Sequence, residues 1–124
     1  MGNKVLAAAM LLALPLISHA QDRKDAELAM TEAGASIDAA ERADAAQFAS
    51  TDLATAHNML ANAQGAYDHH HWTDSVFNAE NAKADANLAS ARSREQRAEQ
   101  ATAEVERSVA TLREQMGISD GGQP

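Results

Sequence analysis

Three consecutive histidines, His69, His70 and His71, are the residues of this sequence best suited to chemistry, and Asp68 and Asp74 lie beside them. Imidazole and carboxylate groups are ligands of Zn²⁺, Cu²⁺ and Ni²⁺, so this segment predicts an open and weak metal site. Consecutive side chains do not point the same way on a helix or a strand, however, and a solvated polar turn is the alternative interpretation. We therefore expect no required cofactor, and at most weak binding of zinc or copper.

Pairs of acidic residues such as Glu104 with Glu106, or Asp22 with Asp25, have the chemistry of a general acid and base. On helices this rich in charge, such pairs are typical of a face in contact with solvent. The sequence contains no cysteine, and it lacks the HExxH pattern, the nucleophile elbow and the glycine-rich phosphate loop that position catalytic groups. We expect a protein without enzymatic activity.

Three aromatic residues, Tyr67, Trp72 and Phe77, cluster around the histidine segment. Tyrosine and tryptophan dominate the energetics of protein interfaces, so they are candidates for a binding hot spot. Alternatively, these large side chains fill the open end of a helical hairpin, where the helices diverge. Tyr67 and Trp72 are therefore candidate partner-binding residues with a structural alternative.

Acidic residues outnumber Lys and Arg by 18 to 10, and they give the chain a net charge of −8. Arg92, Arg94 and Arg97 form a basic cluster, but Glu95 and Glu99 are interleaved with it, which predicts a mixed solvated face. Nucleic-acid binding needs a basic surface that can replace the counterions of the phosphate backbone. We therefore do not expect nucleic acids as partners.

The first 20 residues have the order of a secretory signal peptide. A basic start up to Lys4 precedes the apolar run Val5–Ile17, and Ser18-His19-Ala20 is a small-x-small cleavage site. The apolar run is too short to cross a bilayer as a helix, which needs about 20 residues. We expect cleavage after Ala20 and a mature chain in the periplasm, with no transmembrane segment.

Alanine, the strongest helix former, dominates the rest of the chain, and no proline occurs between Asp22 and Met116. Apolar residues recur there with the three- and four-residue spacing of one helix face. The stripes are Ala26, Ala29, Ala33, Ile37 and Ala40, then Leu53, Ala56, Leu60, Ala63 and Tyr67, then Ala79, Ala82, Ala86 and Ala89. The sequence predicts an all-α fold in which residues 21–116 form one alanine-rich helical domain.

Two candidate breaks divide this domain. A turn is expected at residues 68–72, with Thr73 capping the next helix. The first helix is expected to run to about Phe48, and Ser50 or Thr51 is a suitable N-cap for a further helix. With this second break the fold is a three-helix bundle, and without it the fold is an antiparallel helical hairpin. Either fold has a long C-terminal helix.

The end of the last helix carries one more stripe, formed by Ala98, Ala101, Val105, Val109, Leu112 and Met116. In a three-helix bundle the first helix stops covering the last one near residue 97, which leaves the larger members of this stripe without a partner. We predict a partner-binding surface for a second copy or for another envelope protein, formed by Val105, Val109, Leu112 and Met116. Gly117 is expected in the left-handed conformation that ends the helix, with Ile118 folding back on Leu112, and residues 117–124 are a predicted flexible tail.

Three segments carry a resemblance to a known family: Phe48-Ala49-Ser50-Thr51-Asp52-Leu53, the stripe from Ala56 to Tyr67, and Ala79-Glu80-Asn81-Ala82-Lys83-Ala84-Asp85-Ala86-Asn87-Leu88-Ala89. Roughly residues 28–100 resemble an alanine-rich helical family of Gram-negative envelope proteins, which is classified only as a domain of unknown function. Its members are exported and are often lipidated or placed ahead of an OmpA-like peptidoglycan-binding domain.

This sequence departs from the family pattern at several points. Ser50 stands where the family usually has proline, and Asp44 stands where glycine is common. The lipidation cysteine and the OmpA-like domain are missing, so the resemblance does not imply wall anchoring. It implies a helical fold and an envelope location, and no catalytic residues.

These features predict an exported, non-enzymatic helical protein that is a structural or protein-interaction component of the Gram-negative envelope. The alternative is a periplasmic metal-binding protein that uses His69, His70 and His71. The two functions depend on different residues, because the first needs the C-terminal stripe and the second needs the histidine turn.

Overall fold

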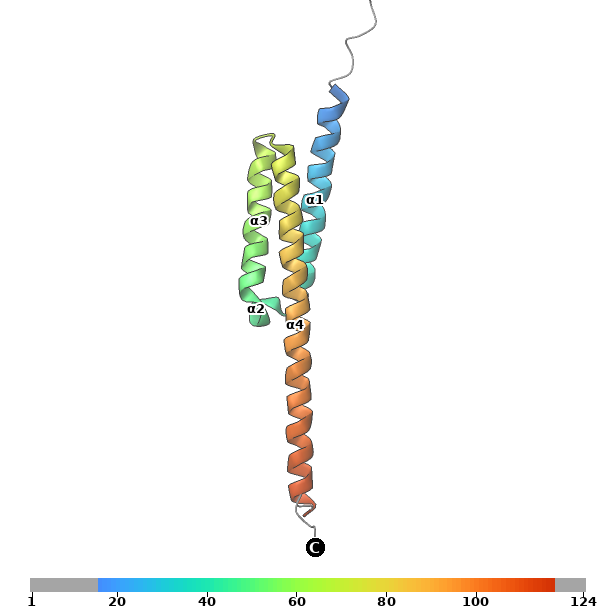
Figure 1. The fold of residues 1–124 in the computed structure, drawn as a ribbon, viewed down its shortest axis with the longest axis vertical. Helices are drawn as coiled ribbons and strands as arrows, with labels where there is room; N and C mark the ends of the chain where they lie inside the picture. Colours follow the sequence, from blue (N-terminus) through green and yellow to red (C-terminus); the bar gives the residue numbers. More distant parts are fainter. Residues whose placement is uncertain (1–15, 118–124) are drawn as a thin grey trace, which may run out of the picture.

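Three long helices and one single-turn helix make up this computed structural model, which describes residues 16–117 (Figure 1). The helices are α1 (Leu16–Arg42), α2 (Ala45–Phe48), α3 (Ser50–Asp68) and α4 (Trp72–Gln115). α4 packs extensively against both α1 and α3, whereas α1 and α3 contact each other much less. The all-α prediction is confirmed, and of the two predicted architectures the structure is the three-helix bundle with a long C-terminal helix.

The two ends of the chain lie mainly outside the described residues. The predicted signal peptide enters the described part only at Leu16, where α1 begins and continues through Ala20. Of the predicted tail, only Gly117 is described, and its φ of 68° is the left-handed conformation expected from the sequence. Ile118 and its expected contact with Leu112 lie outside the described residues.

The link between α1 and α3 contains two breaks, whereas the sequence offers a single candidate break there. α1 ends at Arg42, earlier than predicted, because Asp44 adopts a left-handed φ of 64° that does not continue a helix. α2 then makes a single turn, and Ala49, with a φ of −145°, separates it from α3. Ser50 is the first residue of α3 and Ala49 occupies the N-cap position, so the predicted cap by Ser50 or Thr51 is wrong.

The hairpin between α3 and α4 closes with His70 in the left-handed conformation, at a φ of 61°. The His70 N–H donates to the Tyr67 carbonyl and the His71 N–H donates to the Ala66 carbonyl, each over 2.9 Å. These are the two hydrogen bonds of a Schellman motif, which most often has glycine at the position of His70. The predicted turn is therefore confirmed, and a histidine supplies its unusual backbone conformation.

The N-cap of α4 lies two positions before the predicted one, at His71 instead of Thr73. α4 begins at Trp72, directly after His71, so Thr73 lies inside the helix and the prediction that it caps the helix is wrong. Asp74 lies in the first turn, as expected, where its carboxylate interacts favourably with the positive end of the helix dipole.

Alanine side chains form most of the core. Among residues 19–117, the buried side chains larger than alanine and serine are Ile37 and Leu53. The three predicted stripes face this core, and their buried members are Ala26, Ala33, Ile37, Ala40, Leu53, Ala56, Ala63, Ala79, Ala82, Ala86 and Ala89. Small side chains let the helix axes approach closely, but each buried methyl removes little apolar surface from water.

Within residues 16–117, no helix is both long enough and apolar enough to cross a membrane.

Two arginines of the predicted solvated face instead connect α4 to other segments. Arg92 donates a 2.7 Å hydrogen bond to the carboxylate of Asp52 in α3. Arg97 lies 3.3 Å from the carboxylate of Asp44, in the turn after α1. Both arginine side chains remain about half exposed, so each ion pair contributes modestly to stability. Arg94, the third member of the cluster, is exposed.

Candidate functional site

The last part of α4 extends beyond the rest of the bundle (Figure 1). Ser93 is its last buried residue, and every residue from 94 to 117 is exposed. At 1.5 Å per residue, the helical part of this segment, residues 94–115, is about 33 Å long. The other helices therefore stop covering α4 close to residue 97, as the sequence predicts. We refer to residues 94–117 as the extension.

The extension carries an apolar strip, which we define as Ala98, Ala101, Val105, Val109, Leu112 and Met116. Its four large side chains are accessible, because Val105 is 62% exposed, Val109 40%, Leu112 54% and Met116 65%. The structure thus places the four predicted partner-binding residues of this helix together, on one accessible face. Large apolar side chains exposed in a continuous row are typical of an interaction surface.

The strip and the buried face of α4 lie on different sides of the helix. Successive residues of an α-helix turn by about 100°, so Leu112, 19 residues after Ser93, is rotated by about 100° from it around the axis. A helix bound to the strip would therefore lie to one side of the bundle's core face. The strip is a separate surface and not an uncovered remainder of the same core.

The hydroxyl groups of the extension are already hydrogen-bonded. Thr102, Ser108 and Thr111 each donate to the backbone carbonyl four residues earlier, over 2.9 to 3.0 Å. A buried donor without a partner costs about 1–3 kcal/mol, and these donors avoid that cost if another helix covers them. The polar residues beside the strip are therefore compatible with burial in an interface.

At the other end of the bundle, the aromatic residues are part of the fold. Tyr67 and Trp72 are half-buried and form an edge-to-face pair, with ring centroids 5.0 Å apart. Phe77 is 64% exposed and does not share their burial. The pair at the hairpin end fits the structural interpretation of these residues, in which they fill the space between diverging helices. Their role in partner binding stays a prediction.

The Tyr67 hydroxyl also connects α3 to α1. It donates to the carboxylate of Glu27 and accepts a 2.9 Å hydrogen bond from Nε of Arg23. The hydrogen bond from Tyr67 is the main reason that the pKa of Glu27 lies below its ordinary value, and the charge of Arg23 acts in the same direction. The sequence gives no sign of this network, because it depends on the register of α1 against α3.

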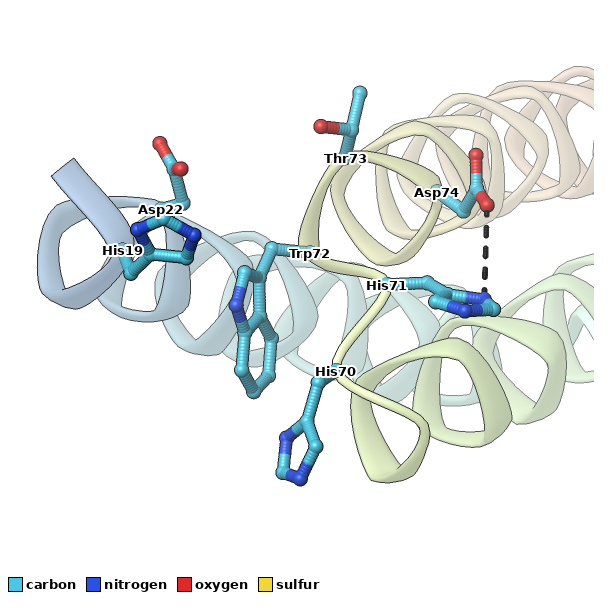
Figure 2. Close-up of a pocket in the computed structure, with 7 residues that line it drawn as sticks. All are labelled: His19, Asp22, His70, His71, Trp72, Thr73 and Asp74. Atoms are coloured by element: carbon cyan, nitrogen blue, oxygen red, sulfur yellow. Dashed lines mark ion pairs between the residues drawn. The ribbon is translucent and has the colours of Figure 1, made fainter. Parts of the chain in front are cut away.

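The three histidines of the turn have separate surroundings. Nδ1 of His69 lies 2.7 Å from the Gly65 carbonyl, and Nδ1 of His71 lies 4.0 Å from the Asp74 carboxylate. The ring of His70 lies beside Trp72, with centroids 5.1 Å apart. Figure 2 shows the side chains of His70 and His71 extending in different directions from the turn. The turn therefore does not bring the three imidazoles to one point.

An open hollow lies between this turn and the start of α1 (Figure 2). It is lined by His19, Asp22, His70, His71, Trp72, Thr73 and Asp74. The sequence does not predict that His19 and Asp22 lie near the turn, since nothing in their spacing shows that α1 reaches the hairpin. Within residues 16–117, no three His, Asp or Glu side chains are grouped so that they could hold a metal ion.

Searches for relatives add no family to this description. A scan against models of protein families, a search of curated proteins and a search of solved structures found no match for this chain.

Proposed function

We propose that this chain is an exported, non-enzymatic helical protein of the Gram-negative envelope, which acts as an interaction component through the apolar strip. One observation carries the proposal: Val105, Val109, Leu112 and Met116 are exposed in a row on a helix that extends beyond its own bundle. The leader sequence and the resemblance over residues 28–100 support export and the envelope location.

Energetics favour a partner on this strip. Fully burying one valine, leucine or methionine side chain contributes about 1.5–3 kcal/mol. A lone helix is only marginally stable in water, and most helical stability in proteins comes from packing of an apolar face. A second helix packed along the extension would bury the strip and stabilise both helices, as in a coiled coil.

The acidic residues of the extension support binding over catalysis. Glu104 and Glu106 are exposed on a single helix, where water solvates both carboxylates. General acid–base catalysis needs such groups within hydrogen-bond reach of a bound substrate. A single exposed helix holds a partner surface more readily than it holds a small substrate in a fixed orientation.

Site-specific crosslinking in a Gram-negative host tests this function. A photoreactive amino acid replaces Leu112 on the strip or, as a control, Ala103 on the opposite face of the extension. We expect protein adducts in the periplasmic fraction from position 112 and few from position 103. Equal adducts from both positions, or none from position 112, would contradict the proposal. Retention of the chain in the cytoplasm would contradict export.

A second candidate function is metal binding at the hairpin end. The observation behind it is that His19, His70 and His71 line the hollow in Figure 2 together with Asp22 and Asp74, and a metal ion would have to draw these side chains together. Micromolar zinc affinity that disappears when the three histidines of the turn become serine would support this function. Cleavage after Ala20 would remove His19, so the precursor and the cleaved chain should then differ in affinity.

A further inference from the structure

We propose that the partner of the strip is a second copy of this chain, paired antiparallel along the extension. The inference rests on the proposed function, because it names the occupant of the same surface. In this arrangement a two-fold axis passes near residue 107, and each contact between the two helices therefore occurs twice.

The sizes of the strip residues are complementary in this register. Pairing about residue 107 sets Ala98 opposite Met116 of the second copy, Ala101 opposite Leu112, and Val105 opposite Val109. Each small side chain faces a large one, and the two valines of intermediate size face each other. Alternation of large and small residues across an interface gives layers of similar volume. A parallel pair would instead set Ala98 against Ala98 and Met116 against Met116, with a gap at one end and crowding at the other.

The spacing of the strip suits two long, nearly straight helices. The strip repeats after 11 residues, because Ala98 is followed by Val109, Ala101 by Leu112 and Val105 by Met116. Three turns in 11 residues give 3.67 residues per turn, close to the 3.6 of an undistorted helix. The strip therefore stays on one side of the helix over its whole length.

The length of the extension leaves room for this overlap. In the antiparallel register, Met116 of the second copy reaches Ala98, and Ala98 lies beyond Ser93, the last buried residue of the bundle. The partner helix therefore covers the whole strip without displacing α1 or α3. The two Ser93 residues would lie about 42 Å apart along the axis.

Charge favours the antiparallel direction. Residues 21–93 contain 12 acidic residues and 5 Lys or Arg, a net charge of −7, whereas the extension contains 5 Glu and 4 Arg, a net charge of −1. Electrostatic repulsion falls off over about 8 Å at physiological ionic strength, so bundles at opposite ends of the pair barely repel each other. A parallel pair would place the two acidic bundles side by side.

Disulfide trapping tests the direction of pairing, and the natural absence of cysteine leaves no background. We expect Met116→Cys mixed with Ala98→Cys to give a crosslinked dimer on oxidation, and each variant alone to give little. Two copies of residue 116 would lie about 27 Å apart in the antiparallel pair, beyond the roughly 7 Å between Cα atoms that a disulfide spans. Efficient crosslinking of Met116→Cys with itself would overturn the antiparallel pair.

Sedimentation of the purified protein tests pairing itself. We expect a concentration-dependent dimer whose dissociation constant rises more than about tenfold in Leu112→Glu, and little change in the control Ala103→Glu on the opposite face. Circular dichroism checks that both variants keep their helices. A monomer at every concentration, together with crosslinks from position 112 to a different protein in cells, would overturn self-pairing while the proposed function stands. A monomer without such crosslinks would overturn both.

Discussion

The Tyr67 hydroxyl donates a hydrogen bond to the Glu27 carboxylate, and this contact joins the end of α3 to α1. Nε of Arg23 lies 2.9 Å from the same hydroxyl and 3.0 Å from the same carboxylate, so the three side chains form one network. α1 and α3 contact each other much less than either contacts α4, and a second side-chain link joins them at His57 and Glu41, whose Nε2 and Oε1 lie 3.0 Å apart. The network therefore helps to hold the N-terminal half of α1 against the hairpin.

Tyr67→Phe should lower the urea midpoint of unfolding at pH 7, because it removes the hydroxyl and keeps the ring beside Trp72. The pKa of Glu27 is lower in the folded state than its ordinary value of 4.5, mainly through this hydrogen bond. The stability that the ionised Glu27 carboxylate contributes is therefore complete above pH 4.5, and it is lost as the pH falls through the folded-state pKa. Urea titrations of both proteins from pH 7 to pH 3 should show the two midpoints converging in acid. Equal midpoints at pH 7 would contradict this role of Tyr67.

Ser75→Ala should stabilise the protein. Within residues 19–117, the Ser75 hydroxyl is the buried side-chain group that has no hydrogen-bond partner, and burying such a group costs about 1–3 kcal/mol. Alanine removes the hydroxyl and keeps the small volume that this close-packed core requires. We expect a gain of about 1 kcal/mol in the free energy of unfolding, measured by urea denaturation.

Ser93→Ala provides the control for this experiment. Ser93 is equally buried, but its hydroxyl donates over 2.8 Å to the Ala89 carbonyl. We expect a change within about 0.5 kcal/mol, because the variant loses one hydrogen bond along with the hydroxyl, and the Ala89 carbonyl keeps its backbone hydrogen bond within α4. A similar gain in both variants would mean that serine hydroxyls in this core cost the same with or without a partner.

His70→Gly should be more stable than His70→Ala. His70 has a φ of 61°, which costs a residue with a β-carbon about 1–2 kcal/mol and costs glycine nothing. Both variants lose the contact between the histidine ring and Trp72, so their difference isolates the backbone effect. Thermal or urea unfolding should rank glycine above alanine by about 1 kcal/mol. Equal stabilities would show that the Schellman turn relaxes when the ring is removed.

The sequence predicts the helices and their buried faces because alanine and leucine recur with helical spacing. The stripe from Ala79 to Ala89 is an example, since its alanines are fully buried as predicted. It also predicts the exposed strip, because a separate apolar stripe with helical spacing lies past the point where α1 stops covering α4. Both predictions rest on local periodicity, which a helix preserves over its whole length.

The sequence does not predict features that depend on single backbone angles or on helix register. Asp44 and His70 break the helices in the left-handed conformation, where glycine would have given a signal. Arg97 pairs with Asp44 only because α4 is rotated so that the two side chains meet. From the sequence alone, the same arginine is equally typical of a solvated helix face. The contacts between helices therefore depend on the three-dimensional arrangement and cannot be predicted from local spacing.

Zinc should leave the helicity and the sedimentation of the protein unchanged at micromolar concentration. Zinc needs several ligand nitrogens about 2.0–2.1 Å from one point. Nδ1 of His69 lies 2.7 Å from the Gly65 carbonyl, His70 lies beside Trp72, and within residues 16–117 no three His, Asp or Glu side chains are grouped to hold a metal ion. Calorimetric titration checks this, with the His69→Ser, His70→Ser, His71→Ser triple variant as the control. Heat of binding in the unchanged protein that is absent in the triple variant would show that the turn rearranges around the metal. Metal binding at the hairpin end, the second candidate function, would then be supported.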